Sequence, residues 1–301
     1  MPMRSSNWAE LLLPTIYSFY DIGRTLRPEL RPQIYNVQTS NRADERNVGY
    51  GGIAPDAWNN YEASGVKSRV EFDKGYTATY THEEYVVTFE VERKLLDDDQ
   101  YGIVAGERAR KLGVSATQKM ELDAASVFNN AFSATFAGPD GKPLCSTTHP
   151  RNPNKTGSLV NAGTSSLTKD AVSLTRQAMM STEDDAGNIL GMMPNALMVP
   201  PELEDTALEI VNSINDPSSA NNAINPQAGR FIVIPWHYLT DSDNWFMMDT
   251  VWMNESLKWY ERTPLEISVA DQTATEAVYE AYMRYSFGWD DWRWVYGHNV
   301  S

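Results

Sequence analysis

Cysteine and long apolar runs are what this sequence has least of. Cys145 is the only cysteine in 301 residues, which excludes an internal disulfide and any Cys-rich zinc site, and fits a protein made in a reducing cytoplasm. No stretch approaches the roughly 20 consecutive apolar residues of a membrane span, and Met1–Glu10 lacks a basic region followed by an apolar one. These absences predict a protein that is neither secreted nor embedded in a membrane.

Motifs for catalysis and metal binding are equally scarce. Cys145 and His149 lie close in sequence, but a lone thiol near a histidine is far more often incidental than a nucleophile with its base. Residues 138–142 lack the full spacing of a phosphate loop and are followed by Pro143, where Ser or Thr would bind magnesium. No histidine has a second one at ligand spacing. We therefore predict no catalytic, cofactor-binding or metal-binding residues and no enzyme activity. The four histidines are His82, His149, His237 and His298.

Positive charge is the third shortage, because the formal net charge is −15. Such a chain repels a phosphate backbone unless basic residues gather on one face, and no such gathering is visible. Any contact with nucleic acid is therefore expected to be non-specific. A modest basic cluster, Arg24, Arg27 and Arg31, is interpreted either as solvated side chains or, the version we favour, as partners for acidic surface on a neighbouring subunit.

The rest of the composition is that of a folded protein. Hydrophobic residues make up 42% and charged residues 22%, and the length allows one large domain or two smaller ones. The first sixty residues differ, because prolines recur from Pro14 to Pro55 and no apolar period extends beyond Leu11–Tyr20. We predict an arm over residues 1–60 that a neighbouring copy orders, since an arm alone would stay unordered.

Strand alternation follows the arm. From Val66 to Arg93 apolar residues recur with a period of two, and Asp73–Gly75 is a turn signal. This pattern predicts a long antiparallel hairpin or a three-strand meander. Its polar faces favour a ribbon that projects and packs beyond its own domain, although an ordinary half-exposed sheet fits the pattern equally well.

The strongest local signal is a long amphipathic helix over residues 102–136. Apolar residues recur every three or four positions without a proline, which is the period of one helix face. At 1.5 Å per residue the helix would span about 50 Å, longer than a compact domain of this size needs. Gly113 is a candidate bend, Asp97–Asp99 suit the positive N-terminal end, and Gly138–Pro139 would stop the helix.

The second half of the chain mixes loops, helices and strands. Residues 138–168 read as a surface loop region, and Glu183–Asp185 as an acidic loop. Residues 276–296 form a closing strand set crowded with Tyr and Trp, which we interpret as core and subunit contact in preference to a sugar-binding or base-stacking platform. Between these regions the sequence predicts helices at 169–182 and 202–213, and strands at 195–199, 230–234 and 245–249.

The order of these elements resembles the Hong Kong 97-type phage capsid fold. Phe89–Asp98 looks like the segment that joins the extended loop to the spine helix in that family, and Asn195–Pro200 like the strand that opens its axial domain. Leu144–Pro150 and Trp289–Arg293 are similar to segments of the major head subunits of Mu-like phages. The likeness covers nearly the whole chain, and each motif alone has modest specificity.

The resemblance implies an α+β fold divided into the regions of that family. An extended β-hairpin loop follows the N-terminal arm, the peripheral domain carries the spine helix (102–136) and the loop region, and the chain returns to the peripheral domain after the axial domain. The implied bounds are 1–60 for the arm, 61–95 for the loop, 96–185 for the peripheral domain, 186–260 for the axial domain and 261–301 for the returning C-terminal strands.

The resemblance also implies a function in assembly. Copies would form hexamers and pentamers of an icosahedral virion shell that encloses double-stranded DNA, after synthesis in the host bacterial cytoplasm. The implied partners are other copies, a portal protein and a candidate decoration protein, with no membrane. The short Pro-rich start leaves no room for a helical scaffolding region, so a separate scaffold is expected. Lys74 is a conceivable donor for a covalent cross-link, but an ordinary solvated turn lysine is the far commoner case.

Two other functions fit parts of the sequence. An encapsulin-like nanocompartment has the same fold but encloses an enzyme, and no residue here separates it from a virus. A soluble carbohydrate-active hydrolase would explain the acidity and the abundant Trp and Tyr. It would need two carboxylates roughly 5 to 10 Å apart in a cleft, a pair that sequence alone leaves open.

Overall fold

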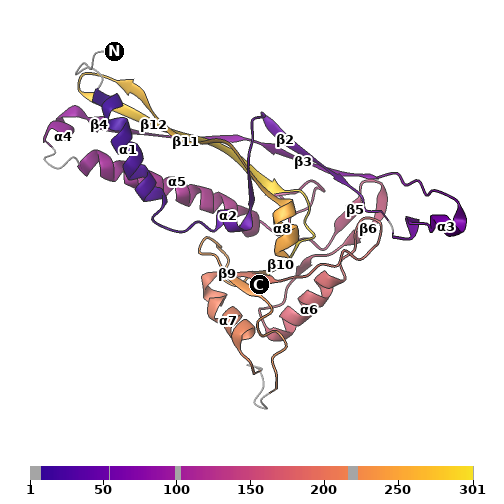
Figure 1. Cartoon of the computed structure of the whole chain (residues 1–301). Coiled ribbons are helices and arrows are strands. Elements are labelled where there is room, and N and C mark those ends of the chain that lie inside the picture. Colours follow the sequence, from indigo (N-terminus) through magenta and orange to yellow (C-terminus); the bar gives the residue numbers. More distant parts are fainter. Residues whose placement is uncertain (1–7, 54, 99–102, 216–222, 301) are drawn as a thin grey trace.

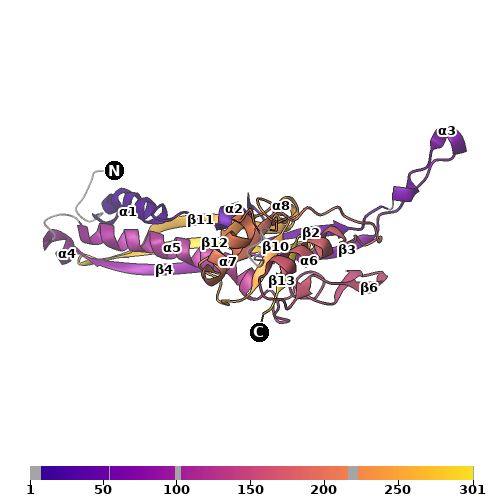
Figure 2. The same cartoon turned by 90° about the horizontal axis from the view of Figure 1, so that it is seen from below.

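The computed structural model describes residues 8–53, 55–98, 103–215 and 223–300. It shows an elongated wedge (Figure 1). A long upper layer combines a four-stranded sheet with helices, a smaller lower unit contains a five-stranded sheet, and a thin projection leaves the body. In Figure 2 the projection bends away from the plane of the body. Helices and strands alternate irregularly along the chain, which confirms the predicted α+β class.

The upper sheet is built mainly from the end of the chain. Its long hairpin pairs two antiparallel strands, and two shorter strands flank it. Alternate side chains of the second hairpin strand, from Ala277 to Tyr285, are buried, as expected for a sheet that is covered on one face. In spatial order the strands are β1 (Asn36–Thr39), β11 (Leu257–Gln272), β12 (Glu276–Trp289) and β4 (Glu83–Glu92).

The long helix α5 (Ile103–Asn129) lies along this sheet (Figure 1) and confirms most of the predicted helix. Its predicted start, Gly102, lies outside the described residues. The end differs, because turns replace the helix after Asn129. There the side-chain amide of Asn130 donates to the Ser126 carbonyl at 2.9 Å, and the Asn129 amide donates to the carbonyl of Tyr238. Because these side-chain hydrogen bonds compete with the backbone pattern of a helix, the helix ends before Gly138–Pro139.

The prediction of an arm over residues 1–60 is wrong for its first part. Helix α1 (Trp8–Arg24) packs against α5 of the same chain. A Cβ on Gly23 would lie 2.1 Å from the Arg110 carbonyl oxygen, and one on Gly113 would lie 2.4 Å from that of Tyr20. Gly113, predicted as a bend, is therefore a point of close helix contact. The apolar period in Leu11–Tyr20 is the buried face of α1, which the scattered prolines concealed.

The basic cluster also finds partners within the chain. Arg31, in the short helix α2 (Arg31–Ile34), is 2% exposed. Its guanidinium pairs with Glu29 at 2.9 Å and with Glu261 at 3.2 Å, and lies over the Trp259 ring. The favoured prediction, pairing with a neighbouring subunit, is therefore wrong for Arg31, because the acidic partners come from its own loop and sheet.

The projection differs from the predicted hairpin. Strand β2 (Asp44–Tyr50) pairs antiparallel with β3 (Lys74–Thr81), whereas β4 pairs with β12. The turn predicted at Asp73–Gly75 is instead the start of β3. Residues 66–72 form no strand, because their alternating apolar side chains have no partner strand and stay exposed. The connection contains η2 (Pro55–Ala57) and α3 (Tyr61–Ser64), which lie at the far end of the projection (Figure 1).

The lower unit contains the five-stranded sheet and three helices, one of them a short 3-10 helix. Every helix and strand predicted between residues 169 and 249 is present with small shifts of its ends. One strand of this sheet, residues 295–298, comes from the region 261–301 that was predicted to return to the peripheral domain. In spatial order the strands are β7 (Ala162–Gly163), β13 (Val295–His298), β10 (Trp245–Met248), β8 (Ala196–Val199) and β9 (Ile232–Pro235), and the helices are η3 (Pro201–Leu203), α6 (Lys169–Met180) and α7 (Glu204–Asn212).

Four shorter elements lie between the helices and strands named so far. Helix α4 (Arg93–Asp98) precedes α5, so Asp98 ends a helix, and Asp99 lies outside the described residues. Helix α8 (Thr250–Ser256) leads into β11. The predicted loop region 138–168 contains a small hairpin, β5 (His149–Asn152) with β6 (Lys155–Leu159).

The main core lies where the two sheets and the C-terminal half of α5 meet. Phe128 of α5 packs edge-on against Trp236, Phe246 and Trp294. The C-terminal aromatic residues Trp289, Trp292 and Trp294 are all buried, which confirms the core interpretation. Each such burial contributes on the order of 1.5–3 kcal/mol, so this core joins the two units into one body.

Candidate functional site

The structure separates the one candidate nucleophile from its candidate base. Cys145 is 2% exposed, and burial raises the pKa of its thiol far above the usual range. His149 is also buried, but its Nδ1 lies 2.6 Å from Asp140 Oδ2 and its Nε2 lies 3.0 Å from Asn161 Oδ1. The two ring nitrogens are thus occupied by groups other than the thiol, so this pair has no geometry for nucleophilic catalysis.

His149 is the centre of a buried polar network. The Asn161 side chain donates to three backbone carbonyls and accepts from the Ser146 amide, which fixes its oxygen toward the ring. Both ring nitrogens therefore face oxygen atoms of buried side chains. The ring also stacks on Trp292 at 3.9 Å between centroids. The network has a structural function.

The remaining motifs of the sequence likewise form no reaction centre. The segment 138–142 is a tight turn, in which the Gly138 amide donates to the Lys142 carbonyl at 2.7 Å and Asp140 is used by His149. Within the part of the chain that the structure describes, no group of three His, Cys, Asp or Glu residues is placed to bind a metal. No described helix is long and apolar enough to cross a membrane.

Exposed aromatic side chains gather on the projection instead. Trp58 is 84% exposed. In the chain it lies between η2 and α3, and α3 is at the far end of the projection (Figure 2). A thin loop cannot bury such side chains against its own body, and an exposed apolar set of this kind marks a contact with another molecule. The sequence analysis missed Trp58, because it fell in the residues assigned to the arm. The other exposed large apolar residues of the projection are Tyr50, Tyr61, Val66, Val70 and Phe72.

The base of the projection is fixed to the C-terminal hairpin. Tyr80 of β3 donates its hydroxyl hydrogen to Asp290 at 2.5 Å, and Asn47 of β2 donates its amide to the same carboxylate at 3.0 Å. Burial raises the pKa of Asp290, and these two hydrogen bonds offset only part of the effect. Because both strands are tied to one buried carboxylate, the projection leaves the body in a defined direction.

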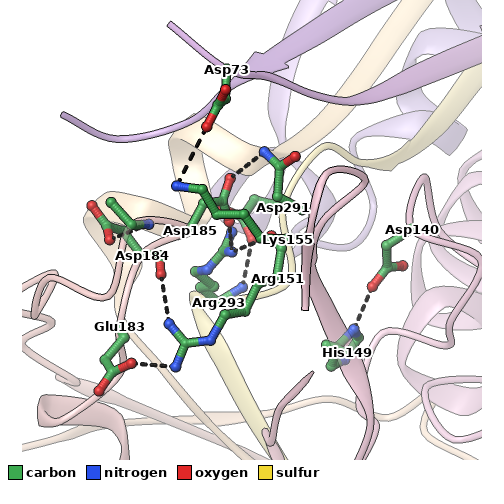
Figure 3. Close-up of polar contacts among 12 residues, drawn as sticks. Asp73, Asp140, His149, Arg151, Lys155, Glu183, Asp184, Asp185, Asp291 and Arg293 are labelled. Atoms are coloured by element: carbon green, nitrogen blue, oxygen red, sulfur yellow. Dashed lines mark hydrogen bonds and ion pairs between the residues drawn. The ribbon is translucent and has the colours of Figure 1, made fainter. Parts of the chain in front are cut away.

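A charged cluster holds the first turn of the projection against the lower unit (Figure 3). Arg293 pairs with Asp185 and, at 2.8 Å, with Asp291. The predicted acidic loop, 183–185, thus forms a turn in which Glu183 and Asp185 pair with arginines, while the Asp184 carboxylate accepts from backbone amides of the same turn. A Cβ on Gly52 would lie 2.1 Å from Asp184, so this turn touches the projection directly. The other pairs are Arg151 with Glu183 and Lys155 with Asp73, the latter at 3.4 Å.

Comparison with known proteins gives one family and several structures. Residues 75–297 match a family described as "Phage capsid protein". No protein of curated function matches the chain by sequence. The chain is similar in structure to the capsid of bacteriophage JBD30 decorated with minor capsid protein trimers, with a TM-score of 0.54, 18% identity and coverage of 71% of this chain and 92% of that chain.

Two further structures cover more of the chain. The capsid of the native GTA particle has a TM-score of 0.56 at 16% identity, with 91% of this chain and 90% of that chain covered. The mature capsid of bacteriophage PhiM1 has a TM-score of 0.60 at 8% identity, with 91% and 88% covered. At such identities the structures establish the fold, and the fold they share is the one that the order of elements predicted.

Proposed function

Because this chain belongs to the phage capsid protein family, we propose that it is the main shell subunit of a tailed-phage head of the Mu-like kind. It is a structural protein of the virion capsid and not an enzyme, and it assembles with copies of itself. Because this family is structural, membership in it argues against the soluble hydrolase that the composition also suggested. In the proposal the copies form hexamers and pentamers, which build an icosahedral shell around double-stranded DNA.

The projecting loop is the observation that carries this proposal. Trp58 at its end is exposed and has no ring contact among the described residues, while its base is tied down by Asp290 and the charged cluster. A rigid projection with an apolar end is the form that a contact between repeated subunits requires, because many identical weak contacts then add up in a closed shell. The five-stranded unit would surround the axis of each hexamer or pentamer, and the upper layer would form its periphery.

The Mu-like assignment is supported by two segments that touch. His149, from the segment Leu144–Pro150, stacks on Trp292, from the segment Trp289–Arg293. Both segments were the ones that resembled the Mu-like head subunits, and their contact makes them one structural feature. A resemblance carried by two interacting segments is more specific than two separate matches.

Other partners follow from the same proposal. A separate scaffolding protein and a portal protein would take part in assembly, and a decoration protein would bind outside, as trimers of a minor capsid protein do on JBD30. The net charge of −15 limits DNA to non-specific contact with the inner surface.

Lys74 is exposed at the start of β3, where it could form a covalent cross-link to another subunit. Bands at subunit mass on a denaturing gel would show that it forms no such link.

Shortening the projection tests the proposal. Replacing residues 53–72 by a short Gly-Ser turn keeps the anchors Asn47 and Tyr80, so the body should fold and unfold as before. We expect soluble subunits and at least a tenfold loss of particles in sedimentation. The control, I214A/I224A, removes exposed apolar surface elsewhere and should assemble normally. Particles of the shortened chain at the full yield would contradict the proposal.

The contents of the particles distinguish a phage head from a nanocompartment of the same fold. Nuclease-protected DNA inside particles from infected cells is the expected result. An enzyme that co-purifies with particles free of DNA would favour the compartment.

A further inference from the structure

The lower unit has an open hollow beside α8. Its volume is about 630 Å³, which is large enough for one or two aromatic side chains. Nine residues line it, from α6, from the segment before β8, from the start of β9 and from α8: Arg176, Gly191, Met193, Pro194, Asn195, Arg230, Asp249, Val251 and Trp252.

The hollow offers an aromatic and apolar surface together with free positive charge. Met193 and Val251 are 73% and 70% exposed, far more than residues of a finished core. Neither the Arg176 nor the Arg230 guanidinium has an ion pair or hydrogen bond among the described residues. Free guanidinium groups beside apolar side chains are suited to a carboxylate that is attached to an aromatic residue.

The single carboxylate of the hollow does not neutralise these arginines. Asp249 accepts hydrogen bonds from the amides of Val251 and Trp252, which begin α8, and from the amide of Met193 at 2.8 Å. Its oxygens are thus used to cap a helix and to fix the wall of the hollow. In a chain with a net charge of −15, it is unusual for two arginines without acidic partners to line the same hollow.

The far end of the projection has the complementary chemistry. Residues 55–64, called here the tip segment, carry Trp58 and Tyr61 together with Asp56 and Glu62, and contain no lysine or arginine. All four side chains are exposed. In both views the tip lies far from α8 of its own chain (Figures 1 and 2), so the tip segment reaches such a hollow only in another copy.

We propose that the tip segment of one copy docks in the hollow of a second copy. Trp58 covers the apolar wall at Val251, and Asp56 and Glu62 pair with Arg176 and Arg230. This inference rests on the proposed assembly of the chain, and it names the surface that receives the projection. The docking neutralises positive charge that is unpaired in the isolated subunit, and it removes an indole from water.

A cysteine pair tests the contact in assembled particles. W58C and V251C are introduced into one full-length chain, and Cys145 does not interfere because it is buried. The matched control is W58C/I224C, since Ile224 is 82% exposed but does not line the hollow. After mild oxidation of particles, we expect a ladder of linked subunits on a non-reducing gel for the first pair and single subunits for the control.

The outcomes separate the docking from the assembly itself. Particles in which W58C/V251C stays unlinked, or in which the control links equally, would overturn the docking and leave the assembly in place. If the unmodified chain forms no particles, the proposed function fails and the docking fails with it.

Charge reversal gives a second test that does not alter Trp58. R176E/R230E should lower the particle yield at least tenfold, and adding D56K/E62K should restore most of it. K111E changes an exposed lysine of α5, outside the hollow, and should leave the yield unchanged. A reversed chain that assembles as well as K111E, or one that the second pair of changes fails to restore, would overturn the pairing.

Discussion

Two buried histidines of this subunit differ in the groups that their ring nitrogens face. The nitrogens of His149 lie beside the Asp140 carboxylate and the Asn161 side-chain oxygen. At His298, Nδ1 accepts from the Ser165 amide, and Nε2 donates to Thr175, whose hydroxyl is already donating to a carbonyl. His298 is therefore neutral, and burial lowers its pKa from 6.5 to about 4.

The neutral state of His298 predicts a loss of stability in mild acid. Below pH 6.5 the unfolded chain binds a proton at this residue and the folded chain does not until about pH 4, so stability falls as the pH falls through this window. Between pH 7 and pH 5 the loss is about 2 kcal/mol. H298N should show a correspondingly smaller pH dependence in urea unfolding.

The exposed His237 supplies the control for this measurement. H237N should keep the pH dependence of the unmodified chain. If H298N and the unmodified chain lose the same free energy of unfolding between pH 7 and pH 5, His298 does not titrate as its surroundings require.

Single residues were the least predictable part of the site. Nothing in the sequence separates Trp58 from the prolines and glycines around it, and its importance follows only from its place in the connection between β2 and β3. Arg176 and Arg230 are far apart in sequence and line one hollow only in the fold. By contrast, the burial of Trp289 and Trp292 was predicted, because aromatic side chains are more often core than exposed platforms.

At the scale of elements, close packing of α1 on α5 is the feature most open to a test. Alanine normally favours a helix over glycine by about 1 kcal/mol. At Gly23, however, the added Cβ would lie 2.1 Å from a backbone oxygen of Arg110, and backbone cannot move aside as a flexible side chain can. We expect G23A to lower the free energy of unfolding by about 1–3 kcal/mol in urea.

An exposed position of the same helix provides the comparison. S18A lies on the solvent side of α1 and should leave the free energy of unfolding within about 0.5 kcal/mol of the unmodified chain. A G23A variant as stable as S18A would mean that α1 does not rest on α5 at this distance.

Local and long-range elements differed in how well the sequence predicted them. Helices α5, α6 and α7 and strands β8 and β10 each show their periodicity within one short stretch of sequence, and all were predicted. The pairing of β2 with β3 joins strands that a long connection separates, and the pairing of β4 with β12 joins the first third of the chain to the last. No local pattern contains these partners, and for this reason the predicted hairpin was placed too late in the sequence.

At the scale of the whole molecule, shape and family agree. The chain is a thin wedge with a projection (Figure 2), and its two sheets share one core. A lone soluble protein has no use for an aromatic residue held away from its body, whereas a repeated shell subunit uses it at every contact. The order of elements along the sequence was sufficient to predict this fold, and the receiving surface required the structure.

The mass of the particles formed by the purified chain tests the central claim most directly. Light scattering with negative-stain microscopy should find hollow particles of megadalton mass or ring-shaped hexamers, since the projection and its apolar end require neighbours. A stable monomer or dimer that never assembles, even with crowding agents or a scaffolding protein present, would contradict the account.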